Sequence, residues 1–226
     1  ILLSDLETPV SAFLKLAGDQ PNSFLLESVE GGAIRGRYSF IGLKPDIIWR
    51  SFGNKAQINK SALSDPDTFE DCSYDTIRSL KNLVDDSCVD LPINLPPMAA
   101  GLVGYLAYDT VRLVERLPDT NPDNLNVPDG IFIRPTIMAV FDTIEDTITL
   151  ITPTRPNNGS SAKDEYGFAI ERLKKAVDLL EKSLPQQIGS VEHETPDPVS
   201  NIEHNYFLNM VERAKNYIRA GDIFQV

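Results

Sequence analysis

The chain has 226 residues, of which 42% are hydrophobic and 24% are charged, as in an ordinary globular protein with a buried core. Its net charge of −12 disfavours nucleic acids, because such binding relies on Lys and Arg to neutralise phosphates. The longest apolar stretch, near residues 99–108, is far shorter than the roughly 20 residues that a membrane span needs. We therefore expect neither a nucleic-acid partner nor a membrane partner.

The first part of the chain predicts one helix followed by strands. Thr8 can cap a helix whose first turn holds Pro9 and whose end lies at Gly18. Four strands are expected over residues 23–29, 37–43, 46–52 and 55–59. The last two flank Gly53-Asn54, a pair that favours a tight hairpin turn. A polar loop is expected to follow over residues 61–71.

The middle of the chain predicts a second helix and further strands. Apolar residues recur at helical spacing at Tyr74, Ile77, Leu80, Leu83 and Val84. Residues 99–108 predict a buried strand, and its glycines indicate close approach by another backbone or a ligand. Residues 114–130 predict a loop, and residues 131–141 and 147–152 predict two antiparallel strands.

The last part predicts two helices separated by a polar linker. The first helix spans residues 162–184, and the linker spans residues 185–198. Ser200 and Glu203 have the spacing of a capping box for a further helix that ends at Gly221. Residues 222–226 predict the start of a strand, which we interpret as a sign that the chain is truncated. This order of elements, without regular βαβ alternation, predicts an α+β fold with largely antiparallel sheets packed with flanking helices.

Several kinds of catalytic chemistry are missing from the sequence. It has no glycine-rich phosphate loop, no metal-ligand spacing and no assignable pair of acid and base residues. Cys72 and Cys88, the only cysteines, are expected to be free thiols in a reducing compartment. The two histidines, His193 and His204, are expected to lie at the surface. The residues by themselves therefore indicate binding potential without catalytic machinery.

Binding chemistry is concentrated in residues 25–42. Glu27 and Ser28 end an apolar strand and could hold the ammonium group of an amino acid; alternatively, Glu27 faces water and Ser28 begins a turn. Arg37 could bind a carboxylate or cover the sheet edge. Farther along, Asp109, Arg112 and Glu115 could form an ion-pair network, or simply the polar exit of a packed strand.

These segments together resemble the N-terminal region of anthranilate synthase component I. The resemblance rests on residues 25–28 (Leu-Leu-Glu-Ser), residues 36–42 (Gly-Arg-Tyr-Ser-Phe-Ile-Gly), residues 101–109 with Glu115, and Phe141-Asp142. In addition, residues 220–226 (Ala-Gly-Asp-Ile-Phe-Gln-Val) resemble the opening of that family's chorismate-binding domain. The resemblance therefore covers essentially the whole chain.

The resemblance implies a lyase that converts chorismate and ammonia to anthranilate and pyruvate with Mg²⁺, for tryptophan biosynthesis. A glutamine amidotransferase subunit supplies the ammonia, and L-tryptophan inhibits. The implied division is a regulatory domain over residues 1–184, a linker over 185–199 and the start of the catalytic domain over 200–226. Catalytic residues and Mg²⁺ ligands are expected beyond Val226, so the fragment should be inactive. The implied tryptophan-binding residues are Leu26, Glu27, Ser28, Arg37, Tyr38 and Ser39.

Three alternatives remain open at this point. Aminodeoxychorismate synthase component I, of the folate pathway, has a similar N-terminal architecture. A stand-alone amino-acid-binding module would bind tryptophan without any catalytic half. A structural protein would instead use its acidic surface to dock a partner. The favoured resemblance implies a cytoplasmic location, or a plastid if the source is a plant or an alga.

Overall fold

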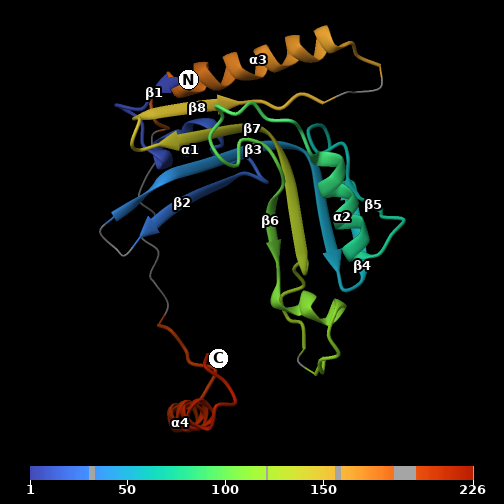
Figure 1. The fold of residues 1–226 in the computed structure, drawn as a ribbon, viewed down its shortest axis with the longest axis vertical. Helices are drawn as coiled ribbons and strands as arrows, with labels where there is room; N and C mark the ends of the chain where they lie inside the picture. Colours follow the sequence, from blue (N-terminus) through green and yellow to red (C-terminus); the bar gives the residue numbers. More distant parts are fainter. Residues whose placement is uncertain (31–33, 121, 156–158, 186–196, 226) are drawn as a thin grey trace. The chain divides into compact units, whose positions relative to one another are not determined.

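The computed structural model describes residues 1–30, 34–120, 122–155, 159–185 and 197–225 (Figure 1). The chain divides into two compact units, Ile1–Pro185 and Gln186–Val226. Among the described residues, no helix is long and apolar enough to cross a membrane.

The first unit is built on one antiparallel sheet of eight strands. The strands are β1 (Leu2–Leu3), β2 (Phe24–Glu30), β3 (Ile34–Phe52), β4 (Lys55–Asn59), β5 (Glu70–Asp71), β6 (Val103–Leu106), β7 (Gly130–Asp142) and β8 (Thr147–Ile151). The helices of this unit are α1 (Pro9–Leu16), α2 (Thr76–Ser87), α3 (Ala162–Leu180) and the 3₁₀ helix η1 (Tyr108–Leu113). The predicted α+β class with antiparallel pairing is confirmed.

The long strands β3 and β7 pair along most of their length and run through two half-sheets (Figure 1). In the first half-sheet the pair is flanked by β2 and by β8 with β1. In the second half-sheet it is flanked by β6 and by β4 with β5. The register shifts between Pro45 and Ile47, where Pro45 faces Pro135 and Lys44 has a φ of 52°. Because proline has no N–H to donate to the ladder, the strands bend there without ending. The two strands predicted over 37–43 and 46–52 are therefore one.

Helices α1 and α3 pack on one face of the first half-sheet. Each begins with a capping box, at Thr8 for α1 and at Ser161 for α3, so each start satisfies its free N–H groups. The buried residues of this core are Ala12, Leu16, Ile41, Leu43, Ile137, Ala139, Phe141, Ile148, Ala176 and Leu180. This helix-covered core fixes the position of the strands that carry the predicted binding residues.

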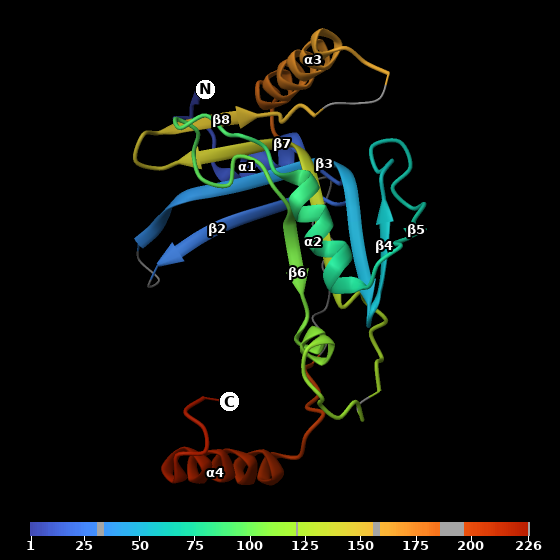
Figure 2. The same cartoon turned by 45° about the vertical axis from the view of Figure 1, so that its right-hand side comes forward.

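Helix α2 packs on the second half-sheet (Figure 2). Its Leu83 contributes to a core cluster with Trp49 of β3 and Ala56 of β4. Trp49 is fully buried, and its indole Nε1 donates a hydrogen bond to Ser79 Oγ at 3.1 Å. The predicted hairpin at Gly53-Asn54 is confirmed, and Gly53 has the positive φ of 53° that the turn requires.

Three predicted elements of the first unit need correction. Residues 70–71, inside the predicted loop, form the short strand β5, because they pair with β4. The buried strand expected over 99–108 is shorter and largely exposed, since β7 is the only described strand that pairs with β6. Helix α3 ends at Leu180, four residues earlier than predicted.

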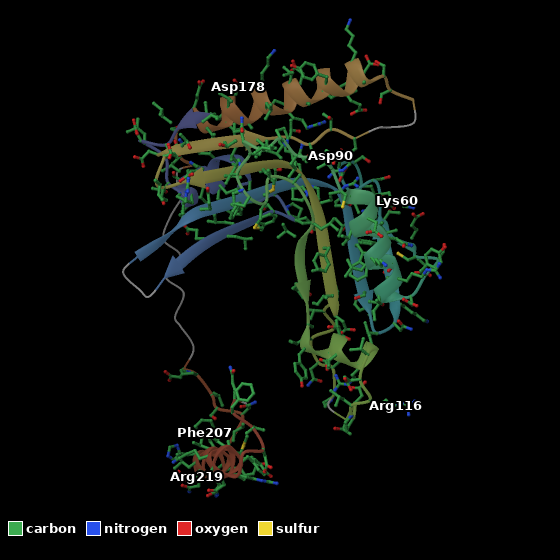
Figure 3. The ribbon with its side chains drawn as sticks, viewed as in Figure 1. Lys60, Asp90, Arg116, Asp178, Phe207 and Arg219 are labelled. Carbon is green, nitrogen blue, oxygen red and sulfur yellow. The ribbon has the colours of Figure 1, made fainter. Side chains whose placement is uncertain are left out.

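The second unit contains helix α4 (His204–Ala220), on which Figure 3 labels Phe207 and Arg219. Glu203 itself is the N-cap and accepts a hydrogen bond from the backbone N–H of Tyr206. The predicted capping box is wrong, because Ser200 instead bonds to the backbone of Ile202. Gly221 ends the helix with a φ of 81°, as predicted. Residues 222–225 form no strand, since no described strand pairs with them.

Candidate functional site

The predicted tryptophan-binding residues lie in the first half-sheet, near the end of the β2–β3 pair where the chain passes from β2 to β3. Leu26 pairs with Phe40, and Glu27 pairs with Ser39. Directly paired residues project to the same face of a sheet, so Leu26 and Glu27 lie on opposite faces. Ser28 falls where the register shifts between Glu27 and Val29, and its side chain lies outside the described part of the structure.

The two faces differ in their surroundings. Leu25 and Ile41 belong to the core beneath α1 and α3, and they lie two residues from Glu27 and Ser39 on their strands. Residues two apart on a strand share a face, so Glu27 and Ser39 lie at the edge of this helix-covered face. Ser39 is buried there, whereas Glu27 is exposed. On the opposite face, Leu26 is 41% exposed. A ligand that contacts both Leu26 and Glu27 must therefore sit around the edge of β2, rather than on one face.

Arg37 is held by an ion pair with Asp142 across the β3–β7 ladder. Its Nε lies 3.0 Å and 3.1 Å from the two carboxylate oxygens of Asp142, and its Nη2 lies 2.8 Å from Oδ2. This hydrogen bonding raises the pKa of Arg37 and, together with the backbone N–H groups of Ile144 and Glu145, lowers the pKa of Asp142. The guanidinium also lies 4.9 Å from the centre of the Tyr38 ring.

This ion pair limits what Arg37 can do. Nε and Nη2 form one edge of the guanidinium, and Asp142 already occupies this edge. Two parallel hydrogen bonds to a ligand carboxylate are therefore not possible there. A ligand carboxylate would have to bind at Nη1 or displace Asp142. Tyr38 lies beside Phe40, with ring centres 6.1 Å apart, so these two aromatic side chains form an apolar surface next to the ion pair.

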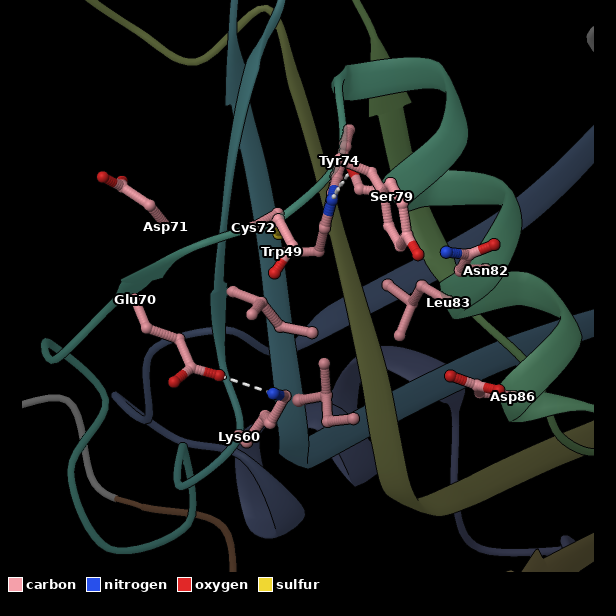
Figure 4. A pocket seen from close by; sticks show the side chains of 13 residues that line it. Trp49, Lys60, Glu70, Asp71, Cys72, Tyr74, Ser79, Asn82, Leu83 and Asp86 are labelled. Atoms are coloured by element: carbon pink, nitrogen blue, oxygen red, sulfur yellow. Dashed lines mark hydrogen bonds and ion pairs between the residues drawn. The ribbon is translucent and has the colours of Figure 1, made fainter.

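A cavity of about 350 Å³ lies in the second half-sheet, between α2 and the strands β4 and β5 (Figure 4). Its apolar lining comes from Ile47, Trp49, Ile58 and Leu83. Its polar lining comes from Lys60, Glu70, Asp71, Cys72, Ser73, Tyr74, Ser79, Asn82 and Asp86. Lys60 and Glu70 form an exposed ion pair at 2.5 Å, and burial raises the pKa of the Cys72 thiol. A raised pKa makes this thiol a poor nucleophile at neutral pH.

A second cavity, also of about 350 Å³, lies near the C-terminal end of α2. It is lined by Val84, Ser87, Cys88, Val89, Leu91, Ala100, Gly101, Leu102 and Phe132. Both cysteines of the chain are free, as predicted. None of the six predicted tryptophan-binding residues lines either of these two cavities.

Comparison with known proteins identifies the family to which the chain belongs. The family described as chorismate binding enzyme matches residues 24–226, which is most of the chain. The chain belongs to this family. Component 1 of anthranilate synthase from Cereibacter sphaeroides is 44% identical over 100% of this chain and 45% of its own length. Component 1 from Thermus thermophilus is 38% identical over 99% of this chain and 44% of its own length.

A solved structure supports the same fold. Anthranilate synthase component I from Streptococcus pneumoniae superposes with a TM-score of 0.56 and 20% identity, over 99% of this chain and 46% of that one. The chain thus spans a little under half the length of the relatives that it matches. The resemblance to anthranilate synthase component I is confirmed. The six predicted site residues and the predicted domain boundaries remain predictions.

The chorismate-binding family match raises the question of Mg²⁺. In the described residues, no three His, Cys, Asp or Glu side chains gather as a metal ion would require. Mg²⁺ prefers near-octahedral oxygen ligands, and these residues offer no such set. We therefore assign no step through Mg²⁺ to residues of this chain.

The structure also groups residues that the sequence did not. Of the predicted network, Arg112 forms an ion pair with Asp109, whereas the described ion pairs of Arg112 include Asp119 and not Glu115. The Arg112 guanidinium also donates a hydrogen bond of 2.8 Å to the carbonyl oxygen of Pro118. The partnership of Arg37 with Asp142, 105 residues away, was missed. The only signal of this pair in the sequence was the opposite charge of the two side chains. The register of β3 against β7, which places Arg37 beside Asp142, cannot be read from the sequence.

Proposed function

We propose that this chain is the N-terminal, tryptophan-sensing part of an anthranilate synthase component I. The complete enzyme would convert chorismate and ammonia to anthranilate and pyruvate in tryptophan biosynthesis. The observation that carries this proposal is the match to curated proteins of that name along essentially the whole chain, two of them at 44% and 38% identity. This chain alone is expected to be inactive, and its proposed role is regulation.

The proposal includes the partners of the complete enzyme. A glutamine amidotransferase subunit would supply ammonia, and Mg²⁺ would bind together with chorismate at residues that this chain does not contain. Mg²⁺ would supply electrostatic stabilisation of charge on the substrate. The proposed location is the cytoplasm. None of the residues described above is assigned a role in the chemical step.

Tryptophan sensing is assigned to the edge where β2 meets β3. The exposed carboxylate of Glu27 is an acceptor for the ammonium group of an amino acid. Leu26, which is 41% exposed, offers apolar contact area on the opposite face. Ser28 lies next to Glu27 at the register shift, where the regular pairing of β2 with β3 is interrupted. Inhibition requires that tryptophan bind one state of the enzyme more tightly than another.

The test uses the complete subunit with its amidotransferase partner. Replacing Ser28 with phenylalanine should weaken tryptophan inhibition tenfold to a hundredfold, since losing a hydrogen bond to a charged group costs about 1.5–3 kcal/mol. Anthranilate formation without tryptophan should be preserved. The matched control is Ser64→Phe, an exposed serine whose Oγ bonds to the carbonyl of Ser61 in a loop of the second half-sheet.

The outcomes separate the alternatives. Unchanged inhibition in Ser28→Phe would reject the assignment of the tryptophan site while leaving the enzyme assignment in place. Formation of aminodeoxychorismate in place of anthranilate would identify the folate-pathway relative. Tryptophan binding without any turnover of chorismate would favour an amino-acid-binding module.

A further inference from the structure

The first cavity, between α2 and the strands of the second half-sheet, has an apolar floor. The apolar side chains that line it are Ile47, Trp49, Ile58 and Leu83. Trp49 and Leu83 are buried, so they form a firmly packed base for the cavity. The indole N–H of Trp49 donates to Ser79 Oγ at 3.1 Å, and Ser79 Oγ in turn donates to the carbonyl oxygen of Thr76 at 3.1 Å. The polar groups at the base therefore bond to one another and stabilise the fold.

The rim of this cavity is polar and carries more negative than positive charge. Among the described residues that line the cavity, Lys60 is the one cation, whereas Glu70, Asp71 and Asp86 are carboxylates. Lys60 already forms an ion pair with Glu70 at 2.5 Å. Asp71 accepts a hydrogen bond of 2.9 Å from the neutral side chain of Gln57. The lining therefore has unmatched negative charge, and its only cation is already paired.

Helix α2 supplies two of the polar groups that line the cavity, Asn82 and Asp86. They lie four residues apart, so they project from the same side of the helix. Figure 4 shows both on the α2 side of the cavity, across from Lys60 and Glu70. The described side-chain hydrogen bonds and ion pairs of α2 and its neighbours engage neither Asn82 nor Asp86. The Asn82 side-chain oxygen and the Asp86 carboxylate are thus two acceptors beside the apolar floor.

The cavity distinguishes Asp86 from an ordinary surface carboxylate, which water solvates without any ligand. Asp85 and Asp86 are both exposed, but only Asp86 lines the cavity. Apolar walls with a few convergent polar groups are typical of a small-molecule site, and the volume of about 350 Å³ lies within the usual range of about 300–1,000 Å³. In the part of the chain that the structure describes, no three His, Cys, Asp or Glu side chains gather as a metal ion would require. The arrangement therefore favours an organic cation.

We propose that the first cavity binds a small primary amine with an apolar body. The ammonium group donates hydrogen bonds to the Asp86 carboxylate and the Asn82 side-chain oxygen, and the apolar body lies against Ile58 and Leu83. An ammonium group has donors only, which matches two acceptors and an excess of negative charge. A ligand carboxylate would be repelled by the same charges, because Lys60 is already paired. This site shares no residue with the tryptophan-binding residues proposed above, and it does not depend on the proposed function.

The test is calorimetric titration of 2-phenylethylamine into the complete subunit. So small a ligand binds in about the millimolar range. 2-Phenylethanol has the same apolar body without the charge, and 3-phenylpropionate has a negative charge instead. Each should bind at least about tenfold more weakly than the amine. This comparison separates recognition of the ammonium group from simple burial of the aromatic ring.

Two variants place the amine in the cavity. Asp86→Asn removes the proposed charged acceptor at an exposed position, and it should weaken binding of the amine about tenfold to a hundredfold. The matched control Asp85→Asn removes the same charge from the neighbouring exposed residue, which does not line the cavity, and should leave binding unchanged. Asn82→Trp fills the cavity from a half-buried position without changing the charge, and it should weaken binding about tenfold or more by exclusion.

Three results would overturn the proposal. The amine is bound elsewhere if wild type, Asp86→Asn and Asn82→Trp all bind it equally well. Equal binding of 2-phenylethylamine and 2-phenylethanol would show that the cavity does not recognise the ammonium group. The absence of measurable binding of the amine to the wild type at millimolar concentrations would exclude the site.

Discussion

The two half-sheets share the strands β3 and β7 but use them differently. In the first, two helices cover one face and form a core of ten buried residues, most of them aliphatic. In the second, a single helix covers the pair, the buried clusters are smaller, and both cavities lie beside it. The buried indole hydrogen bond of Trp49 and the ion pair of Arg134 with Asp46 also lie there. The comparison indicates that the first half-sheet supplies more of the stability, while the second contains most of the buried polar side chains.

The largest expected effect compares two phenylalanines of β7. Phe141 is 3% exposed within the core under α1 and α3, so Phe141→Ala should cost about 3–5 kcal/mol of unfolding free energy. Phe132 is only partly buried and already borders a cavity, so Phe132→Ala should cost about 2 kcal/mol. Urea denaturation of both variants measures the difference. An equal or larger loss at Phe132 would contradict the assignment of stability to the first half-sheet.

A second pair of variants tests how closely the neighbouring atoms pack against a glycine in each half-sheet. A Cβ at Gly42 would lie 2.3 Å from the Phe24 ring, a side chain that can shift, so Gly42→Ala should cost about 1–3 kcal/mol. A Cβ at Gly104 would lie 1.9 Å from the Ile131 carbonyl oxygen, which is backbone. Gly104→Ala should therefore cost more than Gly42→Ala and detach β6 from β7. Hydrogen exchange of the β6 amides measures this, and unchanged protection in Gly104→Ala would refute it.

The third prediction compares Arg134 and Arg155, which both form hydrogen bonds to Ser87 at the end of α2. Arg134→Met removes both hydrogen bonds to the Asp46 carboxylate and should cost about 1.5–3 kcal/mol. Arg155→Met removes one long hydrogen bond, from Nη2 to the Ser87 carbonyl oxygen at 3.3 Å, together with an enclosed Nε that has no described partner, so it should cost less stability than Arg134→Met. The melting temperatures of the two variants, compared with that of the wild type, measure this difference in stability. Equal destabilisation by both would mean that Arg155 is already fully paired.

The smallest expected effect is a pH dependence in the first half-sheet. Arg37 lowers the pKa of Asp142 in the folded state below its ordinary value of 3.8. The stability from this pair is therefore fully present above the ordinary pKa and is lost as the pH falls through the lower folded value. Asp142→Asn should lower the melting temperature slightly near neutral pH, and the difference from wild type should shrink in acid. A difference that does not change with pH would show that Asp142 contributes nothing as a charge.

Local chemistry could be predicted from the sequence with good accuracy. Thr8 and Pro9 start α1, Gly53-Asn54 forms the hairpin turn, and Gly221 ends α4 as expected. These features depend on neighbouring residues only, because caps and tight turns are decided by backbone geometry over a few positions. The bend of β3 was predicted instead as a break, since Lys44-Pro45 reads locally as the end of a strand.

Long-range arrangement could not be predicted in the same way. The exposure of β6 depends on which strands and helices cover it, and an apolar run with glycines does not reveal that. Asp46, Ser87, Arg134 and Arg155 come from four separate segments of the chain, and their hydrogen bonds join residues 47 to 88 positions apart. The predicted tryptophan-binding residues came from the resemblance, and alternation alone could not show that Leu26 and Ser39 point to opposite faces.

The most direct test of the central proposal is the product of the complete reading frame. The full subunit, with chorismate, Mg²⁺ and ammonium, should form fluorescent anthranilate, and added tryptophan should suppress it. This result would identify the present chain as the regulatory part of an anthranilate synthase. Formation of aminodeoxychorismate, or anthranilate formation that tryptophan leaves unchanged, would contradict that account.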